Sequence, residues 1–204
     1  FAGLSISDSG TGFLSEYDQP SRTRRLWQMA IDDSSDKKLL WERNSEDRYG
    51  DPGTPLAMED DQGHRLVRQN GDWIFLTGDG ASDQGDRPFL DRYNIETGES
   101  ERLWRAGTDS YEIMVSPLDD EITRILTRFE SKAEPPNYYV LDLGNGQRTA
   151  LTHFADPHPQ LSGIEKRFVT YERSDGVQLS ATLLLPPDYQ EGQRLPVVVW
   201  AYPR

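Results

Sequence analysis

Short apolar runs, separated by Gly, Pro, Asn, Asp and Ser, cover most of the chain, and within them apolar and polar residues commonly alternate with a period of two. Long stretches with the 3.6-residue period of an amphipathic helix are absent from the sequence. This combination is typical of many short antiparallel strands. The pattern therefore predicts an all-β fold for the greater part of the chain.

A strand–turn–strand unit recurs three times, at residues 25–41, 88–104 and 137–151, and two further apolar runs precede each copy. Repeats of four strands, roughly 40–50 residues long, are the blades of a β-propeller. We expect a propeller segment over residues 1–155, with blades at approximately 1–43, 53–105 and 111–153, and an insertion within 44–70. The alternative is a β-sandwich whose hairpins are similar by accident.

The pattern changes after Ala155. A Pro-rich linker at 156–161 leads into two alternating strands, at 166–172 and 177–185, and then into the β-branched run 195–200, which does not alternate. Such a run suits a strand that is buried on both faces, as in an α/β sheet. We therefore expect residues 156–204 to hold a linker and the first strands of a second, α/β domain.

Charge and composition exclude several classes of protein. Asp and Glu outnumber Lys and Arg by 35 to 22, a net charge of −13, which disfavours nucleic acid or anionic membrane as partners. The absence of Cys excludes disulfides, thiol nucleophiles and thiolate metal sites. The longest apolar runs, at 183–185 and 197–201, are far shorter than the roughly 18 residues of a membrane-spanning helix. No targeting signal assigns the chain to a compartment, and its start at Phe1 predicts a piece of a longer protein.

Two stretches near the end of the chain carry a family resemblance. Residues 173–189, beginning Arg173-Ser-Asp-Gly, and the run Leu195-Pro-Val-Val-Val-Trp-Ala-Tyr202 resemble the start of the catalytic domain of prolyl-oligopeptidase-type serine peptidases. Those enzymes join a β-propeller to an α/β-hydrolase domain. Residues 44–55, 87–91, 95–98 and 158–161 are similar to one branch of them, the glutamyl endopeptidases, which include the chloroplast glutamyl peptidases of plants.

The resemblance implies a fragment of a serine peptidase in which the propeller gates access to a hydrolase domain. Its partners would be a peptide or unfolded protein substrate and the rest of that domain, and no cofactor is implied. The family's nucleophile lies in a G-x-S-x-G elbow, which does not occur in this sequence. We therefore expect the Ser-Asp-His triad to lie outside this chain, and the 204-residue chain alone to be inactive. The alternative function is a non-catalytic β-propeller that binds protein partners.

Tyr202 is the candidate catalytic residue within this chain. It follows the expected strand 195–200, at the end of the strand where α/β sheets place their sites. In the peptidases that the chain resembles, a Tyr at this point donates its hydroxyl to the oxyanion of the tetrahedral intermediate. The alternative is a Tyr that packs at the end of a strand.

Arg22, Arg24 and Arg25 are the candidate substrate-binding residues. They form a basic cluster in the turn after the second expected strand, which we place at the same end of the propeller as the insertion 44–70 and the loop 78–87. A glutamyl-specific peptidase needs a cation for the substrate carboxylate, and Arg offers a bidentate fork. The hypothesis is that one of these arginines contacts the substrate side chain. Ordinary ion pairing is the alternative, and we favour it.

Other polar and aromatic groups have a simpler interpretation. His153, Asp156 and His158 lie in the Pro-rich linker, so we predict no metal site there. His64 and the acidic clusters 59–61 and 119–121 are interpreted as exposed turn residues. Three tryptophans at equivalent positions of the repeats are predicted to pack between blades: Trp27, Trp41 and Trp104.

Overall fold

A computed structural model describes residues 2–33, 35–161, 163–176 and 178–201 of the chain. The chain divides into two compact units, Phe1–Phe154 and Ala155–Arg204. Each unit is described by itself below.

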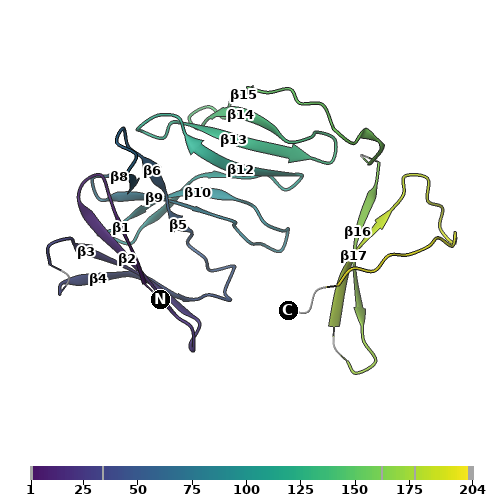
Figure 1. Cartoon of the computed structure of the whole chain (residues 1–204), viewed down its shortest axis with the longest axis horizontal. Helices are drawn as coiled ribbons and strands as arrows, with labels where there is room; N and C mark the ends of the chain where they lie inside the picture. The colour runs from purple at the N-terminus through teal and green to yellow at the C-terminus, as the bar shows by residue number, and fades with distance from the viewer. Residues whose placement is uncertain (1, 34, 162, 177, 202–204) are drawn as a thin grey trace. The chain divides into compact units, whose positions relative to one another are not determined.

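Three antiparallel sheets make up most of the first unit, and apart from the pairing of β5 with β9 the strands that pair within each sheet are neighbours in the sequence (Figure 1). The first sheet consists of β1 (Ala2–Ile6), β2 (Thr11–Asp18), β3 (Thr23–Ala30) and β4 (Lys37–Asn44). The second consists of β5 (Thr54–Pro55), β9 (Trp73–Gly78), β10 (Phe89–Asn94) and β11 (Ser100–Arg105), with β8 (Gln69–Asn70) also paired to β9. The third consists of β12 (Ser110–Pro117), β13 (Arg124–Ser131), β14 (Asn137–Asp142) and β15 (Arg148–Ala150). The all-β prediction for this part of the chain is confirmed.

The insertion forms a small hairpin of its own. Its strands, β6 (Ala57–Glu59) and β7 (Arg65–Val67), pair with each other in register Ala57↔Val67 to Glu59↔Arg65. The hairpin lies in the connection between β5 and β9, the first two strands of the second sheet.

The core lies between the sheets, in two clusters of buried side chains. The first cluster joins the first and second sheets and contains Phe13, Leu26, Val67, Ile74, Leu76 and Ile95. The second joins the second and third sheets and contains Phe75, Leu90, Ile122, Ile125 and Leu141. Strand β9 supplies both clusters, because its successive side chains point to opposite faces of the sheet. The second sheet is therefore buried on both faces.

Two of the three tryptophans pack as predicted. Trp41 lies against the first cluster and Trp104 against the second. The prediction for Trp27 is wrong, because Leu26 takes the buried position on β3 and the next side chain points to the opposite face. Trp27 there donates its indole N–H to Glu16 Oε2 at 2.6 Å, and Lys37 Nζ lies 4.4 Å from its ring centroid.

The second unit contains a two-stranded hairpin of β16 (Glu165–Glu172) and β17 (Gln178–Leu185), preceded by the single-turn 3₁₀ helix Pro159–Leu161. Residues 195–201 form no strand, and Val198 is 93% exposed. The expectation of a buried strand at 195–200 is therefore wrong for this structure, and an α/β-hydrolase start is not shown. A strand buried on both faces needs strands beside it and helices over it, and the described residues of this unit supply only the hairpin.

Candidate functional site

The sheets of the first unit end in two sets of loops. We call one set the arginine end: it contains the turn 19–22, the connection 45–53, the loop 79–88 and the connection 106–109. Ion pairs between loops hold this end together, since Arg22 pairs with Glu46 at 2.7 Å and Arg48 pairs with Asp86 at 3.0 Å. The other set, which we call the insertion end, contains the turn 7–10, the segment 56–68 and the turn 118–123.

The predicted position of the insertion is only partly right. Residues 45–53 lie at the arginine end, but the β6–β7 hairpin lies at the insertion end, where Val67 forms a bridge with Ser7 and accepts a hydrogen bond from Asp8 N at 3.3 Å. Arg68 fixes it there by ion pairs to Asp8 at 3.0 Å and to Asp120 at 3.2 Å. The hairpin goes to this end because β5 precedes it, so that the chain has already crossed the sheet once before the insertion begins.

The structure does not bring Arg22, Arg24 and Arg25 together as one cationic site. Arg22 lies in the turn, with a φ of +55°, and pairs with Glu46. Arg24 and Arg25 are consecutive on β3 and therefore point to opposite faces. Arg25 pairs with Glu42 at 2.5 Å, and the Arg24 guanidinium lies 5.0 Å from the centroid of the Tyr17 ring.

These contacts are the ones that the ion-pairing alternative predicts for Arg22 and Arg25. A contact with a substrate stays a prediction for all three arginines. The other predicted site residue, Tyr202, lies outside the described residues, so its role as an oxyanion donor also stays a prediction.

A different pair of arginines comes together at the arginine end, and the sequence analysis did not single it out. Arg105 ends β11 and pairs with Phe89, the first residue of β10, and Arg87 lies two positions before Phe89, close enough for its charge to act on Arg105. Arg87 Nε donates to the Ala106 carbonyl at 3.0 Å, and Arg105 Nη2 donates to the Gly80 carbonyl at 3.4 Å. The two arginines are 18 positions apart in the sequence, so only the folded sheet could have revealed that they lie close together.

Burial affects the pKa of the Arg105 guanidinium. Desolvation lowers the pKa of its guanidinium below the ordinary value, and the nearby positive charges of Arg87 and Arg102 lower that pKa further. The carboxylate of Asp91 acts in the opposite direction, but Asp91 is itself ion-paired with Arg102. Arginine stays protonated at any physiological pH, so both guanidiniums keep their positive charge.

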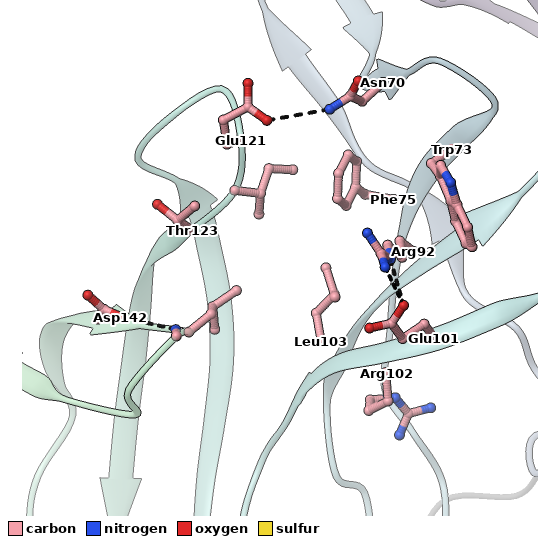
Figure 2. A pocket seen from close by; sticks show the side chains of 13 residues that line it. Asn70, Trp73, Phe75, Arg92, Glu101, Arg102, Leu103, Glu121, Thr123 and Asp142 are labelled. Carbon is pink, nitrogen blue, oxygen red and sulfur yellow. Dashed lines mark hydrogen bonds and ion pairs between the residues drawn. The ribbon is translucent and has the colours of Figure 1, made fainter.

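A pocket of about 560 Å³ opens between the second and third sheets (Figure 2). Its charged side chains are already engaged: Arg92 Nε donates to Glu101 Oε2 at 2.8 Å, and Glu121 accepts from Asn70 at 3.5 Å. The pocket therefore offers space and apolar surface but no open cation for a carboxylate. Its apolar lining comes from Trp73, Phe75, Leu103, Ile122 and Leu143.

Neither a metal centre nor a membrane span is found in the part of the chain that the structure describes. No three or more His, Asp or Glu side chains gather there in a way that would hold a metal ion. Among the described helices, none is long and apolar enough to cross a membrane. His64, predicted to be exposed, is exposed and lies 3.1 Å from Asp60.

Comparison with known proteins finds relatives over the whole chain, although no protein-family model matches it. It is 36% identical over 220 residues to a probable chloroplastic glutamyl endopeptidase of Oryza sativa subsp. japonica. It is 34% identical over 221 residues to the corresponding protein of Arabidopsis thaliana. All of this chain is covered in both cases, but it spans only 24% and 23% of the two relatives, about a quarter of their length.

Solved structures share the fold. Oligopeptidase B from Trypanosoma brucei, determined in a closed form with covalently bound antipain, matches with a TM-score of 0.52 and 12% sequence identity. The match covers 96% of this chain and 33% of the oligopeptidase. At this level of identity the likeness concerns the fold alone. The chain is thus homologous over its whole length to the plant glutamyl endopeptidases, and its sheets have the fold of the propeller region of the prolyl oligopeptidase family.

Proposed function

We propose that this chain is the propeller part of a serine peptidase that cleaves peptides at glutamyl residues. The observation that carries the proposal is the 36% identity to a glutamyl endopeptidase across the full chain. The reaction would be acyl transfer by a Ser-His-Asp triad. Since the sequence contains no G-x-S-x-G elbow, the triad would belong to residues outside this chain.

The propeller would act as a gate that limits the access of large folded proteins to the catalytic chamber. Two features support this role. The sheets are joined side by side through buried clusters, which gives a stiff wall. The loops at the arginine end are tied to one another by ion pairs. A stiff wall excludes by size, so short or unfolded peptides would be preferred over folded proteins.

The test uses the full-length protein that carries this chain. A fluorophosphonate probe, which reacts with activated serine nucleophiles, should label it, and it should cleave fluorogenic peptides with Glu before the scissile bond. It should degrade an unfolded protein such as reduced casein while leaving a folded globular protein of similar size intact. Absence of both labelling and cleavage would overturn the peptidase proposal and favour the non-catalytic interaction module. Equal cleavage of folded and unfolded proteins would overturn the gating role alone.

Tyr202 belongs to this proposal as the donor to the oxyanion. Its hydroxyl would act only in the transition state, so Tyr202→Phe should lower kcat by about 100- to 1,000-fold, the effect of removing one oxyanion donor, with KM little changed. Tyr171→Phe is a control on an exposed tyrosine of β16. An unchanged kcat in Tyr202→Phe would exclude the oxyanion role.

Arg22, Arg24 and Arg25 remain proposed substrate contacts, each tested by an Ala variant in the full-length enzyme. A true contact with the substrate carboxylate would lower the preference for Glu over Gln. An unchanged Glu preference in all three variants would leave ion pairing as their role.

A further inference from the structure

Arg87 and Arg105 differ from most other arginines of the chain in the partners they have. Among the described residues, neither forms an ion pair with a carboxylate, although the chain has 35 Asp and Glu residues against 22 Lys and Arg residues. Both side chains are half-buried, so water does not fully solvate their charge. In the part of the chain that the structure describes, ion pairs with carboxylates are formed by Arg22, Arg25, Arg43, Arg48, Arg68, Arg92, Arg102, Arg124, Arg128, Arg148, Arg167 and Arg173.

The hydrogen bonds that hold the two guanidiniums leave donors unused. Arg87 is held through Nε by the Ala106 carbonyl, and Arg105 is held through Nη2 by the Gly80 carbonyl. The Nε of Arg105 is buried and has no hydrogen-bond partner within the described structure. That atom is too buried to meet a ligand, so the donors left for one are Arg87 Nη1 and Nη2 and Arg105 Nη1.

The backbone around the pair is fixed before any ligand arrives. Gly80 has a φ of +63°, and a Cβ on it would lie 2.0 Å from the Arg87 carbonyl oxygen. Arg87 N donates to the Gly80 carbonyl at 3.0 Å, which closes the neck of the 79–88 loop. A second pair of backbone bonds, between Ser82 and Gly85 at 3.0 Å each, closes its tip. A site on such a loop loses little conformational freedom on binding.

We propose that Arg87 and Arg105 bind the side-chain carboxylate of a glutamyl residue in a peptide. This inference rests on the proposed function, because it assigns the substrate carboxylate of that reaction to a pair of residues. A carboxylate has two oxygens and up to four acceptor directions, which match the donors of two guanidiniums. Its negative charge would also offset the two neighbouring cations. The inter-sheet pocket lacks such donors, and Arg22 and Arg25 already have carboxylate partners.

The first experiment measures kcat/KM of the full-length enzyme on two peptides that differ only in Glu or Gln at the cleavage position. Gln keeps the shape of Glu and removes the charge. In Arg87→Gln and in Arg105→Gln, kcat/KM for the Glu peptide should fall about 10- to 100-fold, the range for a lost charge-assisted hydrogen bond. For the Gln peptide, kcat/KM should change less than about twofold, since a neutral amide gains little from the cations.

The matched control is Arg65→Gln. It makes the same change of charge on an exposed arginine of β7, at the insertion end, and should leave both peptides unaffected. Arg105→Lys is the second variant, for the case that Arg105→Gln does not fold. It keeps the charge but not the fork, so it should still lose most of the preference for Glu. An equal loss on both peptides would mean a structural role and would overturn the proposal.

The second experiment does not depend on catalysis. Calorimetry measures the Kd of a Glu peptide with a reduced, non-cleavable bond, and of its Gln counterpart, for the wild type and the variants. Tighter binding of the Glu peptide that is lost in Arg87→Gln supports the site even if the protein proves to have no peptidase activity. A Kd that is the same for both peptides in the wild type would overturn the proposal. Binding of inorganic phosphate without binding of the Glu peptide would also overturn it.

Discussion

Gly80 illustrates at the residue scale how a missing side chain positions two others. Gly80 has a left-handed φ, and a Cβ added to it would lie only 2.0 Å from the Arg87 carbonyl oxygen. Because glycine has no Cβ, the loop can close directly against the ends of β9 and β10. The same carbonyl of Gly80 accepts both the Arg87 backbone N–H and the Arg105 side chain. The arginine pair therefore depends on a glycine at this position.

Gly80→Ala should destabilise the protein much more than Gly71→Ala. Both positions have similar φ values, +63° and +57°, but a Cβ on Gly71 would meet nothing within 4 Å. Gly71→Ala should cost about 1–2 kcal/mol for the left-handed backbone alone, whereas Gly80→Ala should cost about 3 kcal/mol or more because the loop must also move. Urea unfolding followed by tryptophan fluorescence measures both. Equal losses would contradict the close approach.

Glu16 gives a prediction about pH. The hydrogen bond from Trp27 is the main cause that lowers its pKa below the ordinary 4.5; desolvation opposes this, and Lys37 lowers the pKa further. A lowered pKa in the folded state means that the unfolded state binds more protons in acid. The stabilisation is therefore present above the ordinary pKa of 4.5 and is lost as the pH falls through the folded value.

The measurement is the free energy of unfolding in urea between neutral pH and pH ~3, for the wild type and for Glu16→Gln. The variant cannot lose a proton at this site, so its stability should fall less steeply below the ordinary glutamate pKa. Other carboxyls with lowered pKa, such as Asp119, contribute equally to both proteins and cancel in the difference. Parallel curves would show that the bond to Trp27 does not perturb Glu16.

At the scale of elements, β9 connects the three sheets. Ile74 and Leu76 contribute to the cluster against the first sheet, and Phe75 contributes to the cluster against the third. This explains why the strand reads as a continuous apolar run, Trp-Ile-Phe-Leu, and not as an alternating one. One short strand thus carries the packing of two interfaces on its two faces.

Substitutions on the two faces of β9 should loosen different sheets. Leu76→Ala should speed amide hydrogen exchange mainly in β2 and β3, and Phe75→Ala mainly in β13 and β14. The free energy of unfolding should fall by about 2–5 kcal/mol in Leu76→Ala and by about 3–5 kcal/mol in Phe75→Ala. Each variant is the control for the other, since both change the same strand. Identical exchange maps for the two variants would mean that the first unit opens as one cooperative block.

The strands were readable from sequence because their signals are local. Alternation marks β13 and β17, and Gly98 and Gly146 supply the positive φ that the β10–β11 and β14–β15 turns need. The side of the sheet on which Trp27 lies was not readable, because Leu26 and Trp27 are adjacent and both apolar, so alternation alone does not show which of them faces the core. Likewise, nothing local shows that Thr54–Pro55 pairs with β9 before the chain enters the β6–β7 hairpin, and this pairing decides the end at which the hairpin lies.

On the scale of the whole molecule, the two units differ in how much structure supports them. The first unit has two buried clusters, whereas the second consists of one hairpin with exposed apolar side chains, among them Phe168 at 73% and Trp200 at 81%. An isolated two-stranded hairpin is at best marginally stable in water. Exposed apolar residues of this size are typical of surfaces that another element covers.

In the 204-residue chain by itself, the amides of β16 and β17 should exchange within seconds, while those of β9, β10 and β13 should be protected for much longer. Hydrogen exchange read by mass spectrometry gives both rates in one sample. The reason is that opening the hairpin exposes little further apolar surface, whereas opening the first unit exposes both clusters. Equal protection of the two units would show that the hairpin is stabilised by contacts beyond its own pairing.

The sequence by itself determined the repeated strands, the all-β class and the resemblance to glutamyl endopeptidases, since turn residues, alternation and identity are properties of neighbouring positions. Only the tertiary structure decided which charges meet. Arg22 and Arg25, three positions apart in the sequence, pair with carboxylates on other segments, while Arg87 and Arg105, separated by a whole hairpin, lie close together without one. Pairing register and the packing of sheets set such distances, and these depend on contacts between residues far apart in the chain.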